Sequence, residues 1–102
     1  MNEINTVKIQ KRIYNNKIAK GFNITDIPQE FCLLYGEVGE AFEAWRRQKN
    51  DFGEELADVA IYLLGIAELC KIDLGNEICK KMDIIEKRIY HMVNGALVKD
   101  KD

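Results

Sequence analysis

Apolar residues recur at intervals of three and four positions along most of this chain, and this spacing constrains the fold more than any other feature. Residues three or four apart lie on one face of an α-helix, so each such run predicts an amphipathic helix. Four runs can be traced, over about residues 4–20, 27–45, 52–70 and 74–92. No run shows the alternation of apolar and polar residues that is typical of a half-buried strand. The sequence therefore predicts an all-α fold, arranged as a four-helix bundle.

Local signals mark where these helices begin. The single proline, Pro28, follows the polar segment "NITD" and stands where the second helix would start. A proline in the first turn of a helix loses no hydrogen bond, so it indicates a start rather than a break. Asp51 and Asp73 are expected to cap the third and fourth helices. The connections are short, so residues 1–102 are predicted to form a single domain with a polar tail over about residues 96–102.

Charge and composition exclude several classes of function. The 102 residues carry a net charge of −2, whereas a duplex-binding domain shows a basic excess, so we expect no nucleic-acid partner. The longest apolar stretch, at 59–67, is too short to span a bilayer as a helix, and residues 1–12 lack the apolar core of a signal peptide. Cys32, Cys70 and Cys79 form no CxxC motif and are interpreted as buried free thiols. We expect a soluble, cytoplasmic protein with no membrane partner.

The third predicted helix differs from the others because apolar residues surround much of it. Leu56, Val59 and Leu63 follow the stripe, and further alanine, isoleucine and leucine residues fill the flanking faces. A lone bundle of this size would struggle to cover such a helix. We therefore expect this helix to be central in the fold or to contribute one face to a subunit contact, and the expected assembly is a homodimer or homotetramer.

Two tetrapeptides, "EVGE" at 37–40 and "ELAD" at 55–58, each place two acids three residues apart. This spacing occurs five times in the chain, so alone it is weak evidence for a site. These acids differ from ordinary surface acids because no Lys or Arg stands three or four positions away on either side, whereas Glu43 has Arg46 and Arg47. We call the four residues the acid cluster: Glu37, Glu40, Glu55 and Asp58.

An antiparallel hairpin of the second and third helices, turning near residues 47–50, would bring the two acid pairs level with each other. Four carboxylates at such a distance repel, and partial burial adds to the cost, so a cation is expected among them. All-oxygen ligands suit Mg²⁺, with Mn²⁺ as an alternative. Partly exposed structural acids are the other interpretation. A di-iron centre is not expected, because it needs Glu-x-x-His motifs and no acid stands three residues before His91.

The acid pairs and their surroundings, "LLYGEVGEAFEAW" and "DFGEELADVAIYLLGIAELCKIDL", resemble a known family. It is the MazG-like branch of the all-α nucleoside triphosphate pyrophosphohydrolases, whose relatives include the dimeric dUTPases and the dCTP pyrophosphatases. The segment "KMDIIEKR" at 81–88 is similar to a later family element, Lys-x-x-x-Asn-x-x-Arg. The resemblance covers about residues 27–95.

This resemblance implies that the acid cluster holds Mg²⁺ and carries catalysis, converting a (deoxy)nucleoside triphosphate into the monophosphate and pyrophosphate. It also implies that Lys81 and Arg88 contact the substrate phosphates. The chain departs from the family at two positions. Ile85 stands where asparagine is usual, and Gly36 stands where many relatives carry another acid. Both departures leave the base and sugar of the substrate unassigned.

Two further functions are compatible with the same residues. A non-catalytic helical oligomerisation or nucleotide-sensing module would keep the fold and the metal; Ile85 favours it, and the intact acid cluster argues against it. A hydrolase of another pyrophosphate-linked nucleotide would differ only in its base pocket. Phe22 and Trp45 are candidates to stack on a base, although Trp45 continues an apolar stripe and is expected in the core.

Overall fold

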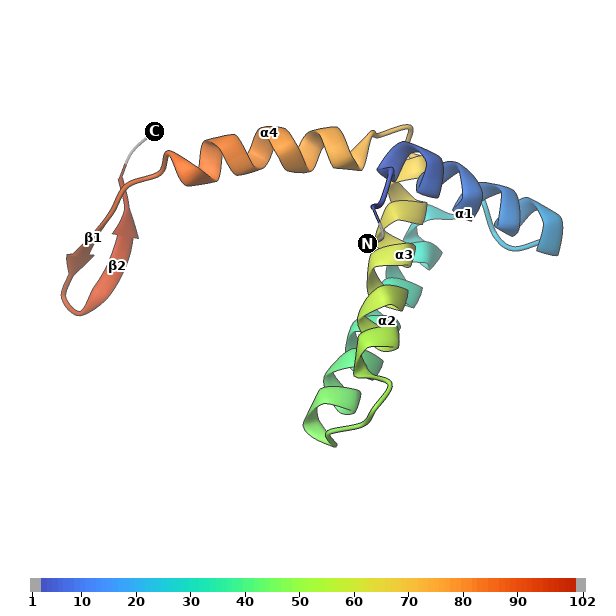
Figure 1. Ribbon diagram of the computed structural model, residues 1–102, viewed down its shortest axis with the longest axis horizontal. Coiled ribbons are helices and arrows are strands. Elements are labelled where there is room, and N and C mark those ends of the chain that lie inside the picture. The colour runs from blue at the N-terminus through green and yellow to red at the C-terminus, as the bar shows by residue number, and fades with distance from the viewer. Residues whose placement is uncertain (1–2, 101–102) are drawn as a thin grey trace.

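The computed structural model describes residues 3–100, and within them the chain forms four helices followed by a β-hairpin (Figure 1). The elements are α1 (Thr6–Lys20), α2 (Ile27–Arg46), α3 (Phe52–Leu69), α4 (Leu74–Glu86), β1 (Tyr90–Val93) and β2 (Ala96–Lys99). The predicted all-α class with four helices is confirmed. Residues 101–102 of the predicted polar tail lie outside the described residues.

The helices begin at the positions that local sequence signals indicate. Pro28 lies in the first turn of α2, and the Asp73 side chain accepts a hydrogen bond from the backbone N–H of Asn76 at the start of α4. Asp51 precedes α3 as predicted, but its side chain makes no capping hydrogen bond to the described residues that follow it. The charge of its carboxylate instead raises the pKa of the Glu55 carboxyl group.

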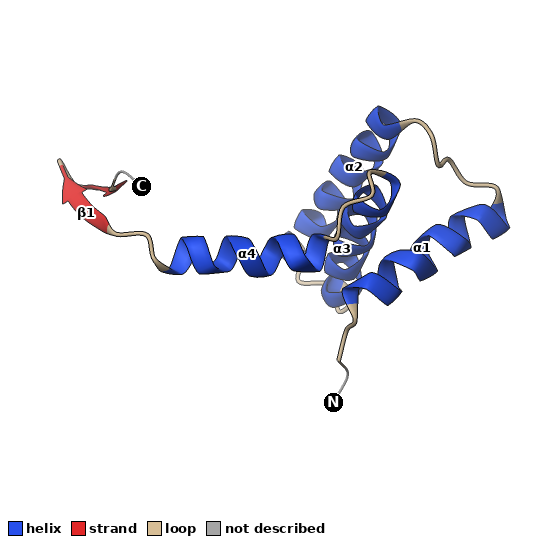
Figure 2. Ribbon diagram, turned by 90° about the horizontal axis from the view of Figure 1, so that it is seen from above, coloured by secondary structure: helices blue, strands red, loops and turns tan. Residues whose placement is uncertain are grey.

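The core lies where α1 crosses the antiparallel hairpin of α2 and α3 (Figure 2). The buried apolar residues come from α2 and α3: Leu34, Ala41, Ala44, Ile66 and Ala67. The helix α3 packs against both α2 and α1, so its predicted central position is confirmed. None of the helices within residues 3–100 is long and apolar enough to cross a membrane.

Gln10 fixes the path of the chain from α3 to α4. Its side chain is almost fully buried, and its amide nitrogen donates hydrogen bonds to the Glu68 carboxylate and, at 2.9 Å, to the carbonyl oxygen of Ile72. Its amide oxygen accepts a hydrogen bond from the backbone N–H of Leu74. A single buried side chain of α1 therefore ties together the end of α3, the connection and the start of α4.

The helix α4 and the hairpin extend away from the other three helices (Figure 1). We call residues 74–99 the C-terminal arm. No residue of α4 is buried, and every residue of β1 and β2 is exposed. The radius of gyration is 17.1 Å, whereas a compact chain of this length has about 13 Å. The arm therefore accounts for an unusually open shape.

The hairpin corrects the predicted extent of the fourth helix. That helix was expected to continue to about residue 92, but α4 ends at Glu86, and residue 96 begins a strand rather than a polar tail. Asn94 and Gly95, with φ of 51° and 81°, form the turn between the strands. An Asn-Gly pair adopts the left-handed conformation of a tight hairpin turn at low cost, so the turn outweighs the apolar spacing that suggested helix.

Two expectations about burial are also wrong. Trp45 is 60% exposed and contacts Phe42 rather than the core, because α1 crosses the far end of the α2–α3 hairpin and leaves the turn end uncovered (Figure 1). The three cysteines are free, as predicted, but all are exposed. Cys79 is exposed because the whole of α4 lies away from the core.

Candidate metal centre

The antiparallel pairing of α2 and α3 brings the two acid pairs of the cluster face to face. One carboxylate oxygen from each of Glu37, Glu55 and Asp58 lies within 4.8 Å of the others. Glu40 adjoins this group, because its charge acts on the carboxyl groups of both Glu37 and Glu55. The hairpin geometry predicted from the sequence is therefore present, with three acids in close contact and the fourth beside them.

Burial and mutual repulsion raise the pKa of two of these acids. The pKa of Glu37 is raised first by burial and then by the charges of Glu40, Asp58 and Glu55. The pKa of Glu55 is raised by burial and by the charges of Glu40, Asp51 and Asp58, while Lys49 acts in the opposite direction. Ionisation of both groups is therefore less favourable than in water, and a positive charge among them would favour it.

Two carboxylate oxygens in the cluster have no hydrogen-bond partner. Oε2 of Glu37 and Oε2 of Glu55 are both shielded from solvent, and no donor among the described residues reaches them. The nearby arginines are engaged elsewhere, since Arg46 and Arg47 both form ion pairs with Glu43. Shielded, unpaired carboxylate oxygens in a group of three are the ligands that a hard divalent cation prefers. The donor set fits Mg²⁺ or Mn²⁺.

The structure does not bring Lys81 and Arg88 to the acid cluster of the same chain. Lys81 lies on α4 and Arg88 just beyond it, in the arm that extends away from α2 and α3 (Figure 1). The acids on α3 lie near its N-terminal end, whereas α4 follows its C-terminal end. The Nε atom of Arg88 is shielded and has no hydrogen-bond partner among residues 3–100. The predicted phosphate contacts are absent from this site as a single chain forms it.

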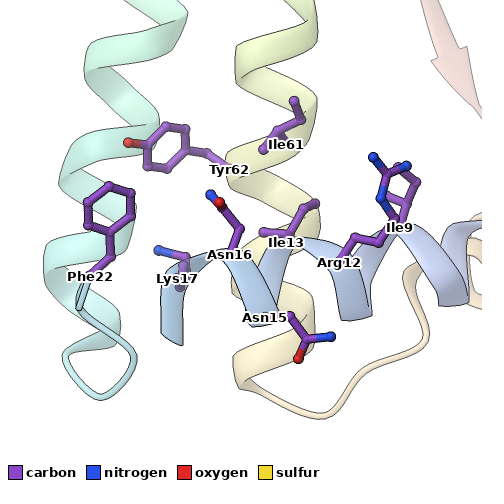
Figure 3. Close-up of a pocket in the computed structure, with 9 residues that line it drawn as sticks. All are labelled: Ile9, Arg12, Ile13, Asn15, Asn16, Lys17, Phe22, Ile61 and Tyr62. Carbon is purple, nitrogen blue, oxygen red and sulfur yellow. The ribbon is translucent and has the colours of Figure 1, made fainter. Parts of the chain in front are cut away.

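A pocket of about 610 Å³ lies between α1 and α3, beside the loop that follows α1 (Figure 3). It is lined by Ile9, Arg12, Ile13, Asn15, Asn16, Lys17, Phe22, Ile61 and Tyr62. Its volume falls within the range of small-molecule sites. Sequence reasoning singled out Phe22 as a possible stacking residue but not the polar residues of α1, because no local motif marks Asn15 or Asn16.

Tyr62 connects this pocket to the acid cluster. It follows Asp58 by four residues on α3, so the two side chains lie one helical turn apart on the same face. The pKa of the Tyr62 phenol is raised first by burial and then by the charges of Glu37, Glu30 and Asp58. The phenol therefore stays protonated near neutral pH, within electrostatic reach of the cluster and at the wall of the pocket.

A buried ion pair holds the loop that carries Phe22. Lys17 of α1 pairs with Glu30 of α2, and the side-chain amide of Asn23 donates a hydrogen bond of 3.1 Å to the second Glu30 oxygen. Both charged side chains are shielded from solvent. The pair was missed at the sequence level because its partners stand 13 residues apart on different helices.

Comparison with curated proteins identifies relatives over part of the chain. Bovine (Bos taurus) dCTP pyrophosphatase 1 is 34% identical over 91 residues, which cover 74% of this chain and 54% of the relative. The human (Homo sapiens) protein of the same name is 38% identical over 76 residues, covering 60% of this chain and 45% of the relative. The chain resembles dCTP pyrophosphatases. It spans about half the length of the curated relatives it matches.

This similarity supports, at a coarse level, the MazG-like pyrophosphatase family that the acid pairs and their surroundings indicate. No family model matches the chain, and no solved structure matches it. The similarity to dCTP pyrophosphatases and the geometry of the acid cluster point in the same direction.

Proposed function

We propose that this chain is an Mg²⁺-dependent nucleoside triphosphate pyrophosphohydrolase, which converts a (deoxy)nucleoside triphosphate into the monophosphate and pyrophosphate. The observation that carries this proposal is the group of Glu37, Glu55 and Asp58, whose oxygens lie within 4.8 Å of one another, together with a pocket of about 610 Å³ whose wall includes Tyr62, one helical turn from Asp58. The relatives named dCTP pyrophosphatase 1 support the reaction class and make dCTP the first substrate to test.

In this reaction the acid cluster would hold the metal, which would neutralise charge on the triphosphate oxygens. Phosphoryl transfer depends mainly on positioning and charge neutralisation, so a cluster of carboxylates on two rigid helices is a suitable scaffold. A carboxylate of the cluster accepts the proton that the attacking water releases.

The adjoining pocket would take the nucleoside. Phe22 offers a ring on which a base can stack. Asn15 and Asn16 each carry one acceptor and two donors, the groups that read the edge of a base. The protonated phenol of Tyr62 lines the pocket one helical turn from Asp58, where it would donate a hydrogen bond at the junction of sugar and phosphates. The pocket and the cluster therefore match the two ends of one nucleotide.

We also propose that the chain forms a homo-oligomer and acts in the cytoplasm. Large apolar side chains of the α2–α3 hairpin, including Phe42 and Leu56, are exposed in the single chain, and such surface favours self-association. Three free thiols suit a reducing compartment.

The test is release of pyrophosphate from a panel of ribo- and deoxynucleoside triphosphates, with the nucleotide product identified. Glu40→Gln and Asp58→Asn are expected to lose activity by about 100-fold or more, as is wild type in excess chelator. Glu43→Gln is the matched control, because Glu43 also lies on α2 but is paired with Arg46. It should retain activity.

Two outcomes would redirect the proposal. Folded wild type that binds triphosphates but hydrolyses none would reject the enzyme and favour the nucleotide-sensing module. Hydrolysis confined to other pyrophosphate-linked nucleotides added to the panel would keep the chemistry and reject a triphosphate as the substrate.

A further inference from the structure

Two buried charged side chains have no role in the proposed reaction. Lys17 of α1 and Glu30 of α2 are 9% and 1% exposed, and they form an ion pair between the two helices. A buried ion pair often adds no net stability, because well-packed apolar residues of similar volume stabilise a fold as well or better. Packing alone therefore does not account for charge at this position.

Lys17 is also part of the wall of the pocket between α1 and α3 (Figure 3). Its Nζ atom lies 5.9 Å from the centre of the Tyr62 ring, which lines the same pocket. The backbone N–H of Phe22 donates a hydrogen bond of 2.9 Å to the carbonyl oxygen of Lys17, so the end of α1 fixes the backbone of one residue relative to the other. A base that stacks on Phe22 would therefore share the pocket with the Lys17 ammonium group.

The Lys17 ammonium group has one hydrogen to spare. A lysine ammonium carries three hydrogens and no acceptor. One hydrogen is donated to the Glu30 carboxylate, and another is donated over 3.4 Å to the backbone carbonyl oxygen of Asn23. The third meets no nitrogen or oxygen acceptor within residues 3–100. A ligand in the pocket can therefore supply an acceptor that these residues do not.

The surroundings of Lys17 indicate which kind of acceptor fits. Glu30 balances the charge of Lys17, and Asn23 donates a hydrogen bond of 3.1 Å to the other oxygen of Glu30. The pair as a whole is neutral, so it offers little net attraction for a phosphate group. The spare hydrogen therefore suits a neutral oxygen, such as a carbonyl oxygen of a base.

Lys17 differs from the two asparagines of the pocket in what it can recognise. Asn15 and Asn16 carry both donors and an acceptor, so a rotated amide can face either kind of group. An ammonium group can only donate. If an amino group of a base faced Lys17, two donors would meet in a shielded position and would leave a hydrogen bond unmade, which costs free energy. The ammonium group therefore discriminates where the amides do not.

We propose that Lys17, held in place by Glu30, selects nucleotides whose base carries a carbonyl oxygen on the edge that faces it. Cytosine, thymine, uracil and guanine each carry such an oxygen. Adenine is the exception among the common bases, because it presents an amino group and no carbonyl oxygen. This inference rests on the proposed function for the kind of ligand, but the selection of the base can be measured without turnover.

Two purine ligands that differ in the group at C6 test this selection. Deoxyinosine monophosphate carries a carbonyl oxygen there, whereas deoxyadenosine monophosphate carries an amino group. Isothermal titration calorimetry of wild type with each monophosphate measures recognition of the base without hydrolysis. The deoxyinosine ligand is expected to bind about 10- to 100-fold more tightly, the range for a hydrogen bond to a charged group. Equal affinity, tighter binding of the adenine ligand, or no measurable binding of either overturns the proposal.

A double variant assigns the preference to Lys17. Lys17→Met combined with Glu30→Leu removes the donor without leaving a buried charge unpaired, and thermal melting verifies that the variant folds. Its affinities for the two monophosphates should become equal. Lys20→Met is the matched control, because Lys20 lies in the last turn of the same helix but outside the pocket, and it should keep the wild-type preference. A preference that survives in the folded double variant overturns the proposal, and the comparison in wild type decides the point if this variant unfolds.

These measurements also separate the inference from the proposed function. A preference for the carbonyl ligand, together with no hydrolysis of any triphosphate, would reject the proposed function and leave the selection of the base intact. Hydrolysis of deoxyinosine triphosphate and dATP with equal KM and kcat would keep the proposed function and reject the role of Lys17.

Discussion

Lys17 and Glu30 form an ion pair that is buried between α1 and the start of α2. Lys17 lines the pocket between α1 and α3, and Glu30 holds the loop before α2 through its hydrogen bond with Asn23. The ion pair therefore links the packing of α1 to the shape of the candidate site.

Removal of one partner of this pair is expected to be costly. Lys17→Met or Glu30→Leu leaves a buried charge unpaired, which costs about 3–5 kcal/mol. The double variant should lose much less than the sum of the two, and urea unfolding measures all three. Lys11→Met, which breaks the partly exposed pair with Glu68, should cost at most about 1 kcal/mol. Additive losses in the double variant would show that the pair is not coupled.

In the metal-free protein, the stabilising contribution of the acid cluster should fall as the pH rises above the ordinary carboxyl pKa of 4.5. The pKa of Glu37 and that of Glu55 are raised in the folded protein, so the folded state holds these protons more tightly than the unfolded state. Their contribution to stability is full below the ordinary pKa of 4.5 and is lost as the pH rises through the raised values. Thermal melting in chelator across this range measures it.

Glu37→Gln is the matched variant for this pH dependence. Its stability should fall less than that of wild type as the pH rises. Glu43 contributes with the opposite sign, because Arg46 lowers its pKa. The difference between wild type and Glu37→Gln therefore isolates the cluster. Saturating Mg²⁺ should reverse the trend, because the metal binds the deprotonated acids. Identical pH profiles for wild type and Glu37→Gln would contradict the assignment.

Mg²⁺ should raise the melting temperature through the acid cluster. Asp58→Asn is expected to weaken Mg²⁺ binding by about 10- to 100-fold, because it removes one of three converging carboxylates. Isothermal titration calorimetry with Mg²⁺ alone measures this loss independently of turnover. Glu77→Gln, on the exposed α4, should bind as wild type. Equal affinities for wild type and Asp58→Asn would exclude a metal centre at this position.

Phe22→Ala should impair binding of the nucleoside more than the chemical step. Loss of one stacking contact corresponds to about a 10-fold rise in KM with little change in kcat. Steady-state kinetics on the best substrate separate the two constants. Tyr35→Ala is the control, since Tyr35 is an exposed aromatic residue of α2 outside the pocket. A fall in kcat at constant KM would place Phe22 outside the base subsite.

Gly75→Ala should weaken the packing of α4 against α1. The added methyl group would collide with Thr6, and such overpacking costs about 1–3 kcal/mol. Adding Thr6→Ala removes the nearest atom and should restore part of the loss. Thermal melting of the single and double variants measures both changes. Full stability in Gly75→Ala alone would show that α4 can shift against α1 without penalty.

The sequence predicted the features that depend on neighbouring residues. Pro28 and Asp73 mark helix starts because their effects act within one turn, and the paired acids stand out because the absence of nearby bases is visible in the chain itself. Once α2 and α3 pair antiparallel, the meeting of Glu37 with Glu55 and Asp58 follows.

The features that sequence reasoning missed depend on competition between two local signals or on partners far away in the sequence. The Asn94–Gly95 turn carries a strong hairpin signal, but the apolar residues before it continue the spacing of a helix, and turn chemistry prevailed. The burial of Lys17 and Gln10 depends on partners 13 and 58 or more residues away, which no local pattern reveals. The direction of the arm depends on the hydrogen bonds of Gln10 and on the close contact between Gly75 and Thr6, whose partners lie far apart in the sequence.

The order of the elements along the chain has a consequence for biosynthesis. The three helices that build the acid cluster and the pocket are translated before α4 and the hairpin emerge from the ribosome. The nascent chain can therefore form the core of α1, α2 and α3 before the C-terminal arm is complete. A message cut short after α3 would yield a product that retains every acid of the cluster but lacks the exposed apolar surface of α4.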